Sequence, residues 1–184
     1  MTEKNPWQTK STKVVYENPW IKVSEDNVNR PDGQPGIYGV VHFKNKAIGI
    51  LPIDAQGNVY LVGQYRYPLK RYSWEIPEGG CPELEDPQTA AKRELSEETG
   101  LSAGKWEELC RADLSNSVSD EEAIIFLATE LTIGQANPEP TEQLMPRRVS
   151  FAEALAMVKR GEILDSMSVI AITYFACFFN NINR

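Results

Sequence analysis

Three short runs of apolar and β-branched residues open the chain, and turn signals separate them. Asn18-Pro19 divides the first run from the second, and Pro31-Asp32-Gly33 divides the second from the third. Apolar runs bounded by such turns are typical of strands. We therefore expect residues 1–43 to form a small N-terminal antiparallel β unit that begins with a loose polar segment at 1–13. The expected strands cover residues 14–16, 21–28 and 37–43.

From residue 44 onward, strand-like runs alternate with helix-like runs. Strands flanked by helices of this length favour a mixed sheet covered on both faces, which is an α/β/α sandwich of the α+β class. We expect residues 44–184 to form this one domain, with a long loop rich in Pro and Glu at 133–146. The expected strands cover 47–53, 59–67 and 123–129, and the expected helices cover 87–99, 150–160 and 165–179.

The helix at 87–99 carries signals at both ends. Asp86 is a preferred N-cap residue, and Pro87 suits the first helical position because its missing N–H is not needed there. Gly100 stands where a left-handed residue commonly ends a helix. Ser150 and Glu153 have the spacing of a capping box at the start of the next helix.

Charge and composition exclude several classes of function. The net charge is −7 and the sequence pI is about 4.9, so the surface repels phosphodiester backbones and a general nucleic-acid binder is not expected. The first residues lack the apolar core of a signal peptide, and the longest apolar stretch, 169–179, is too short to span a membrane. Cys81, Cys110 and Cys177 are odd in number and far apart, which predicts reduced thiols in a cytoplasmic protein.

Three glutamates gather on one side of the expected helix at 87–99. Glu94 lies three residues from Glu97 and four from Glu98, so the three carboxylates share one arc of its surface. Two carboxylates about 4 Å apart repel by roughly 4 kcal/mol at an effective dielectric constant of about 20. A hard divalent cation such as Mg²⁺ or Mn²⁺ removes that repulsion. Taken alone, the three acids would also fit a solvated helix face.

These acids belong to a longer spaced pattern. It matches the Nudix box at every specified position, and the chain therefore resembles the Nudix hydrolase superfamily. The order of the flanking strands and helices extends the resemblance over most of the sequence. The matching residues are Gly79, Glu85, Arg93, Glu94, Leu95, Glu97, Glu98, Gly100 and Leu101.

The resemblance implies a magnesium site. Glu94 and Glu98 would hold the metal, Glu97 would be a third ligand or would hold a water, and the main-chain carbonyl of Glu78 would complete the site. Such a metal neutralises a diphosphate and lowers the pKa of a bound water that attacks phosphorus. Arg93 and Glu85 are expected to form a structural ion pair between helix and loop.

Outside the box, the chain is similar to the ADP-sugar pyrophosphatase branch. The run Gln64-Tyr65-Arg66 before the glycine loop, Gly79-Gly80, carries this likeness. Arg66 would bind the diphosphate, although an exposed edge-strand arginine is the alternative. The branch also implies a homodimer in which Trp20 and Tyr38, from different subunits, stack on the base of a nucleotide sugar. The alternative for both aromatics is cross-strand packing within the small sheet.

The catalytic base is expected on the long loop. The same branch places a glutamate there, where Glu142 aligns best and Glu139 is the reserve, whereas other branches use a box acid, which keeps Glu97 as a competitor. His42, the only histidine, has no acid partner in view and is interpreted as structural. No Ser/His/Asp nucleophile pattern is visible.

One departure from the branch bears on the substrate. ADP-ribose hydrolases often carry a proline downstream of the box, and residues 114–121 contain none. This leaves GDP-mannose, other nucleotide sugars and dinucleotides open beside ADP-ribose. A sensor domain without catalysis usually has a damaged box, and this box is intact. An RNA-end pyrophosphohydrolase is disfavoured by the acidic pI.

Overall fold

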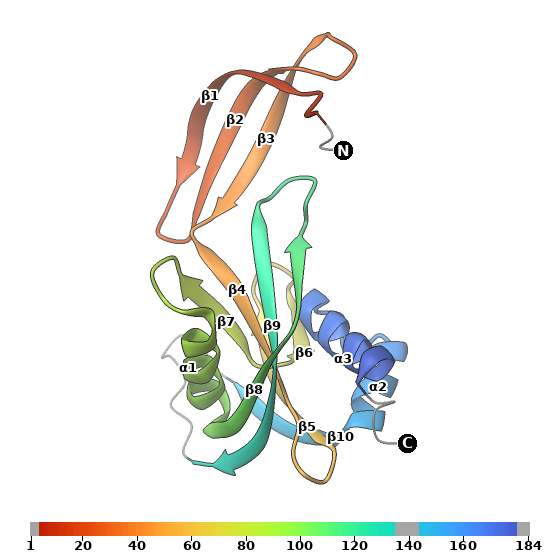
Figure 1. Cartoon of the computed structure of the whole chain (residues 1–184). Coiled ribbons are helices and arrows are strands. Elements are labelled where there is room, and N and C mark those ends of the chain that lie inside the picture. Colours follow the sequence, from red (N-terminus) through yellow and green to blue (C-terminus); the bar gives the residue numbers. More distant parts are fainter. Residues whose placement is uncertain (1–3, 135–143, 180–184) are drawn as a thin grey trace.

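The first three strands form a small antiparallel sheet at one end of the molecule (Figure 1). In this computed structural model, which describes residues 4–134 and 144–179, the strands are β1 (Gln8–Glu17), β2 (Ile21–Asn29) and β3 (Pro35–Phe43), in that order across the sheet. The expected N-terminal sheet is confirmed. The expectation of a loose segment up to residue 13 is wrong for residues 8–13, because the backbone of β1 pairs with β2 although its side chains are polar and exposed.

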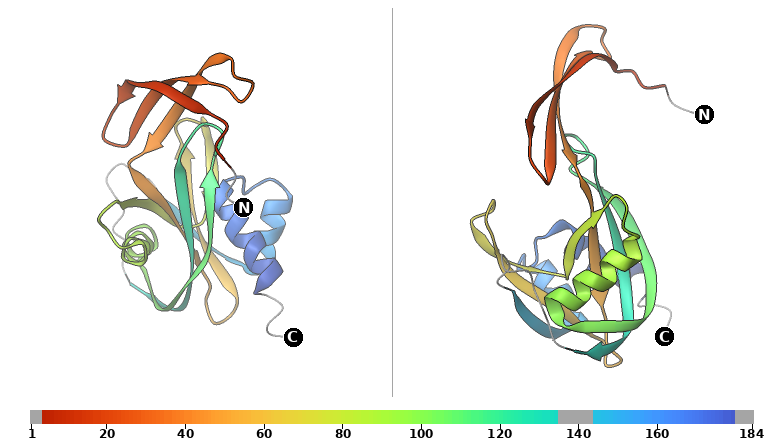
Figure 2. Two further views of the ribbon diagram at one scale, coloured as in Figure 1. Left: turned by 45° about the horizontal axis from the view of Figure 1, so that its top comes forward. Right: turned by 90° about the vertical axis from the view of Figure 1, so that its left-hand side faces the viewer.

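A four-stranded mixed sheet forms the centre of the rest of the chain. Its order is β7 (Glu78–Pro82), β4 (Asn45–Pro52), β9 (Glu121–Ile133) and β8 (Leu101–Leu114). The pair β4 and β9 is parallel, whereas β7 and β8 run antiparallel to their neighbours. Figure 2 shows the small sheet standing beyond one end of this central sheet.

The two inner strands of the central sheet, β4 and β9, are buried on both faces, which explains why each contains a continuous apolar run. On one face, Ile48 and Ile124 pack with helix α1 (Pro87–Thr99). On the other face, Leu51 and Ile125 pack with helix α3 (Ser166–Phe178). Helices on the two faces of a mixed sheet confirm the expected α+β sandwich.

A second, three-stranded sheet adjoins the sandwich. Its order is β10 (Met145–Ser150), β5 (Asn58–Arg66) and β6 (Arg71–Glu75), and helix α2 (Phe151–Lys159) follows β10 directly. The loop expected at 133–146 is wrong at both ends, since β9 includes Ile133 and β10 begins at Met145. Strands β6, β7, β8 and β10 are absent from the sequence-based prediction.

The predicted helix ends are confirmed. The side chain of Asp86 accepts a hydrogen bond from the amide of Thr89 at 2.9 Å, and Gly100 has a φ of 70°, a conformation that favours glycine. The side chain of Ser150 accepts the amide of Glu153 at 3.1 Å. These caps fix where α1 and α2 begin. The start of α1 in turn sets the direction in which the box acids point.

Candidate active site

Two box acids of helix α1, Glu94 and Glu98, pack against the glycine loop. Glu98 is only 2% exposed, and its Oε2 accepts the N–H of Glu78 at 3.1 Å. A Cβ added at Gly79 would overlap the carboxylate of Glu94, so only glycine leaves room for that acid. The box therefore places two carboxylates directly on the backbone of β7.

Arg93 joins the helix to the loop. Its guanidinium donates to Glu85 at 3.0 Å, to the carbonyl of Gly80 at 2.9 Å, to Glu94 at 2.6 Å and to Glu97 at 3.1 Å. The predicted pair of Arg93 and Glu85 is thus present. The hydrogen bonds to Glu85 and then to Glu94 raise the pKa of Arg93 above its usual value.

Four glutamates from α1 and the preceding loop gather close to the guanidinium of Arg93. One guanidinium binds Glu85, Glu94 and Glu97, while Glu98 lies buried beside them against the amide of Glu78. Burying like charges is unfavourable without a compensating cation. The donors are all oxygen atoms, so they fit a hard divalent ion such as Mg²⁺ or Mn²⁺.

A second acidic cluster lies on the other side of Glu78. One carboxylate oxygen from each of Glu75, Glu78 and Asp165 lies within 4.8 Å of the others. Arg66, at the end of β5, donates to Glu75 at 2.6 Å and also bonds Glu78. Glu75 is the last residue of β6, and Asp165 is the N-cap of α3. The sequence pattern assigns neither residue a role in the site. The cluster forms only when these separate elements meet.

The environment of Glu78 and Arg66 shifts their pKa values in a consistent way. Burial, with the nearby charges of Asp165 and Glu75, raises the pKa of Glu78 well above its usual value. Burial alone would lower the pKa of Arg66, but its hydrogen bonds to Glu75 and the charge of Glu78 raise it. Arg66 therefore stays a cation between acids, with its side chain 34% exposed toward solvent.

A cleft of about 390 Å³ opens over these residues. Trp20, from the small sheet, stands at its rim and is 68% exposed. Glu121, at the start of β9, also lines the cleft, and burial raises the pKa of its carboxyl group. Glu121 is not among the residues predicted from the sequence, because residues 114–121 are considered there only for their lack of proline. The lining comprises Trp20, Phe43, Asn45, Lys46, Ala47, Arg66, Glu78, Gly79, Gly80, Glu121 and Met167.

The structure does not bring every expected residue to this cleft. Tyr38 lies on β3 outside the lining, where its hydroxyl donates to the carbonyl of Ser117 at 2.7 Å and its ring meets Trp7 edge-on. Glu142 and Glu139, the expected bases on the long loop, lie outside the described residues. Glu97 lies on α1 with a hydrogen bond to Arg93.

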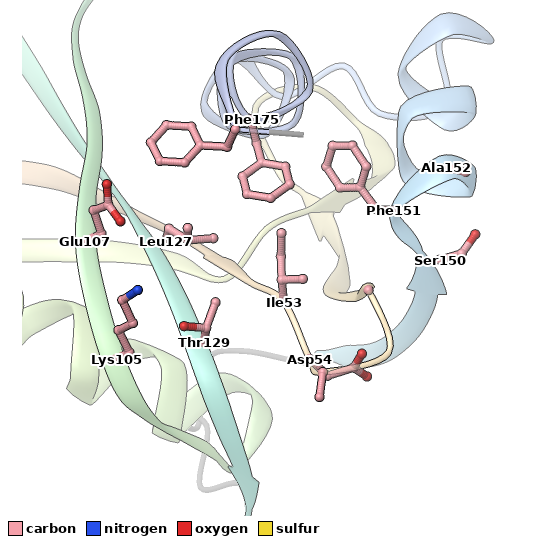
Figure 3. A pocket seen from close by; sticks show the side chains of 13 residues that line it. Ile53, Asp54, Lys105, Glu107, Leu127, Thr129, Ser150, Phe151, Ala152 and Phe175 are labelled. Atoms are coloured by element: carbon pink, nitrogen blue, oxygen red, sulfur yellow. The ribbon is translucent and has the colours of Figure 1, made fainter. Parts of the chain in front are cut away.

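A larger cavity, of about 790 Å³, lies elsewhere. Figure 3 shows Phe151 and Phe175 on one side of it and Lys105 and Glu107 of β8 on the other. Neither Arg66 nor the glycine loop lines it, so its size does not make it the catalytic site. The smaller cleft is lined by Arg66, Glu78 and Gly79. Glu94 and Glu98 are not part of that lining, but they pack against Gly79 and the amide of Glu78.

The interpretation of His42 needs one correction. It has an acid partner, because its Nδ1 lies 2.6 Å from Oδ2 of Asp120. Asp120 is 78 residues away in sequence and sits just before β9, so nothing local in the sequence indicates the pair. The Nε2 atom of His42 lies 3.0 Å from Oγ of Ser24.

Comparison with known families agrees with this geometry over both parts of the chain. The family described as "NUDIX domain" matches residues 43–166, and "Nucleoside diphosphate sugar hydrolase N-terminal domain" matches residues 7–41. The chain belongs to the Nudix family. The Nudix match includes the glycine loop, α1 and the cleft residues Arg66 and Glu121.

Relatives of this Nudix protein support an enzyme. An ADP-ribose pyrophosphatase of Mycobacterium tuberculosis is 34% identical, covering 90% of this chain and 81% of its own, and one of Bacillus subtilis is 30% identical, covering 91% of each. A methanol dehydrogenase activator of Bacillus methanolicus is 31% identical, also covering 91% of each. A crystal structure of an ADP compounds hydrolase has the same fold, with a TM-score of 0.88, 18% identity and full coverage of both chains.

The protein is therefore a Nudix pyrophosphohydrolase. Its box acids are complete, which agrees with a catalytic family member. Among the helices of the described residues, none is both long and apolar enough to cross a membrane.

Proposed function

We propose that this Nudix enzyme is a Mg²⁺-dependent hydrolase that cleaves the pyrophosphate bond of an ADP-sugar such as ADP-ribose, giving AMP and a sugar phosphate. The observation that carries the proposal is the cleft, in which an aromatic at the rim, an arginine below it and the glycine loop beside the box acids share one space. The ADP-ribose pyrophosphatases among the relatives favour the same class of substrate.

Four groups of the glycine loop and α1 are assigned to the metal. Glu94 and Glu98 would bind it directly, Glu97 would bind it or hold a water, and the main-chain carbonyl of Glu78 would complete the set. When bound, the ion would neutralise the diphosphate and lower the pKa of an attacking water. Arg93 keeps Glu94 and Glu97 oriented through its hydrogen bonds, so the ligands are held before the metal arrives.

Arg66 is assigned to the substrate diphosphate. Its guanidinium is already fixed by Glu75, which is 2% exposed, and it faces the cleft with about a third of its side chain exposed. An arginine held this way loses little conformational freedom on binding an anion. Trp20 would stack on the adenine, a contact worth about 1–3 kcal/mol.

A carboxylate must accept the proton of the attacking water. We assign this to Glu142, with Glu139 as the reserve on the same loop. Glu97 is the competing assignment, because it lies on α1 among the expected metal ligands and is a third exposed.

We also propose a homodimer in which Tyr38 serves the site of the second copy. In the register of β2 and β3, Tyr38 lies opposite Asp26 and Phe43 opposite Ile21, so the two aromatics Tyr38 and Trp20 stand at least five strand positions apart. That is roughly 17 Å along a strand, whereas two rings that enclose a purine lie roughly 7–8 Å apart. This separation favours a site in which each chain supplies one face of the sandwich.

The exposed surface of the small sheet supports the same dimer. Val14, Val15, Tyr16 and Ile37 are between 49% and 68% exposed, although each is apolar or aromatic. A second copy around a two-fold axis would cover these side chains and bring Tyr38 to the neighbouring cleft.

The three free cysteines fit a reducing compartment, and we place the enzyme in the cytoplasm.

A hydrolysis panel tests the proposed substrate. The enzyme would be incubated with Mg²⁺ and ADP-ribose, ADP-glucose, GDP-mannose, a dinucleoside diphosphate or a nucleoside triphosphate, and the products separated by chromatography. We expect ADP-ribose to give AMP and ribose 5-phosphate with the highest kcat/KM. A clear preference for GDP-mannose, which the absence of proline in 114–121 keeps open, would replace the substrate and retain the reaction.

A further inference from the structure

His42 connects the small sheet to the turn between β8 and β9. Its Nε2 lies 3.0 Å from Oγ of Ser24 on β2, and its Nδ1 lies 2.6 Å from Oδ2 of Asp120. The other oxygen of Asp120, Oδ1, accepts the amide of Phe43 at 3.0 Å. One carboxylate thus binds both a side chain and the backbone at the end of β3.

The order serine, histidine, aspartate is also that of a nucleophilic triad. Here, however, Ser24 is 2% exposed, so no substrate can reach its hydroxyl. The three side chains therefore act as a hydrogen-bonded connection between elements. In the tautomer with its hydrogen on Nδ1, His42 donates to Asp120 and accepts the hydroxyl of Ser24 at Nε2.

Backbone contacts reinforce this connection. The amide of Val41 donates to the carbonyl of Val118 at 2.8 Å, and the amide of Asp120 donates to the carbonyl of Val41 at 3.3 Å. The hydroxyl of Tyr38 donates to Ser117. Figures 1 and 2 show the β8–β9 turn reaching toward β3. We call this set, residues 38–43 of β3 with residues 117–120, the β3–hairpin joint.

The joint adjoins the cleft on two sides. Phe43, whose amide is held by Asp120, lines the cleft, and Glu121, the next residue after Asp120, lines it as well. Trp20 is linked to the same strand end, since the amide of Lys44 donates to its carbonyl at 3.0 Å. Breaking the hydrogen bonds of Asp120 would therefore let Phe43 and Trp20 move relative to Arg66, which lines the same cleft.

We propose that Asp120 and His42 are positioning residues that hold the small sheet, and with it Trp20, over the catalytic cleft. The assignment rests on the proposed hydrolysis of a nucleotide sugar, because Trp20 is the group that would meet the base. Neither residue touches the reacting phosphate. Their loss weakens substrate binding and leaves the chemical step intact, because the proposed metal ligands are on α1 and β7.

Kinetics of paired variants test the proposal. With ADP-ribose and saturating Mg²⁺, we expect His42→Phe and Asp120→Ala each to raise KM at least about fivefold while kcat stays within about twofold. The double variant should be no worse than either single one, because both remove one shared connection. Asp120→Asn should restore KM, since an asparagine can accept from Phe43 and donate to the other tautomer of His42. Asp32→Ala, an exposed acid of the β2–β3 turn, is the matched control with unchanged KM.

Amide hydrogen exchange gives a readout that does not depend on activity. The amide of Val41 donates to the carbonyl of Val118 across the joint, a bond that Asp120→Ala leaves in place, so Val41 should exchange faster only if the whole joint opens. Unchanged exchange at Val41, or an unchanged KM in both single variants, would overturn the positioning role. If the wild-type enzyme does not hydrolyse ADP-ribose, the proposed substrate fails, and the exchange at Val41 still decides for or against the joint.

Discussion

Gly79 shows how closely the backbone and a box acid meet. A methyl group there would overlap the carboxylate of Glu94, which is the end of a flexible side chain and can turn away. We therefore expect Gly79→Ala to fold with little loss of thermal stability but to lower kcat at least about 100-fold, because a metal ligand is displaced. Gly39→Ala, on an open stretch of β3, is the control. Near wild-type turnover in Gly79→Ala would contradict the placement of Glu94.

Asp54 predicts how stability depends on pH. Burial alone would raise its pKa, but hydrogen bonds from the amides of Asn58 and Gln56 and from Arg148 hold the pKa below 3.8. A carboxylate with a lowered folded-state pKa contributes stability at pH above its unfolded value and loses it as the pH falls through the folded value. Its contribution should therefore be present at neutral pH and fade in acid.

The variant Asp54→Asn measures that contribution. At pH 7 we expect its Tm to lie roughly 2–4 °C below that of the wild type, in line with a loss of about 1 kcal/mol. The difference should narrow as the pH is lowered below 4, because the wild-type carboxylate becomes protonated. Asp32→Asn, at an exposed turn, should show no such trend. A Tm difference independent of pH would contradict the charge of Asp54 as the cause.

Among the elements, α1 could be predicted from the sequence and β8 could not. The signals of α1 are local, since Asp86, Pro87, Gly100 and the spacing of the acids lie within one segment. Strand β8 carries charged residues such as Lys105 and Glu107 on a face that α3 leaves open, so its apolar alternation is weak. Its long pairing with β9 decides its structure.

The site divides in the same way. The box acids and Arg93 are encoded together, and their contacts follow the predicted helix. Glu75, Asp165 and Glu121 lie on different elements, and only the fold brings them to Glu78 or to the cleft. Sequence spacing carries no record of such contacts, whereas a charge cluster within one helix is visible at once.

The proposed catalytic base lies in the segment between β9 and β10. If Glu142 accepts the proton of water, Glu142→Gln should lower kcat at least about 100-fold with KM nearly unchanged, because the variant keeps its shape but cannot take a proton. Glu139→Gln is the matched control on the same loop and should be mild. An active Glu142→Gln together with an inactive Glu97→Gln would move the base to α1.

At the scale of the whole molecule, the proposed dimer predicts complementation between two defective chains. Tyr38→Ala should raise KM more than Tyr38→Phe, which loses only the hydroxyl bond to Ser117 of its own chain, and Glu98→Gln should abolish turnover. If Tyr38 serves the partner's site, a mixed dimer of Tyr38→Ala with Glu98→Gln has one site with both defects and one site that keeps the aromatic ring. Activity should then reappear with a KM no higher than that of Tyr38→Phe. Light scattering must first show a dimer.

Matched mixtures make the dimer test decisive. Each variant mixed with itself by the same unfolding and refolding step is the control for subunit exchange. A monomer at micromolar concentration, or a mixed dimer whose KM equals that of Tyr38→Ala alone, would contradict the shared site. In the latter case the aromatic and the metal ligands of one site come from the same chain.

The most direct test of the central assignment is metal-dependent hydrolysis of ADP-ribose by the wild type and Glu98→Gln, side by side. Glutamine retains an acceptor for the amide of Glu78 but lacks the charge, so the metal-free variant should be as stable as the wild type or more so. We predict that chelator-treated wild-type enzyme is inactive, that Mg²⁺ restores AMP formation, and that Glu98→Gln lowers kcat at least about 10³-fold at saturating Mg²⁺. Near wild-type turnover by Glu98→Gln, or AMP formation by wild type without a divalent metal, would contradict the assignment.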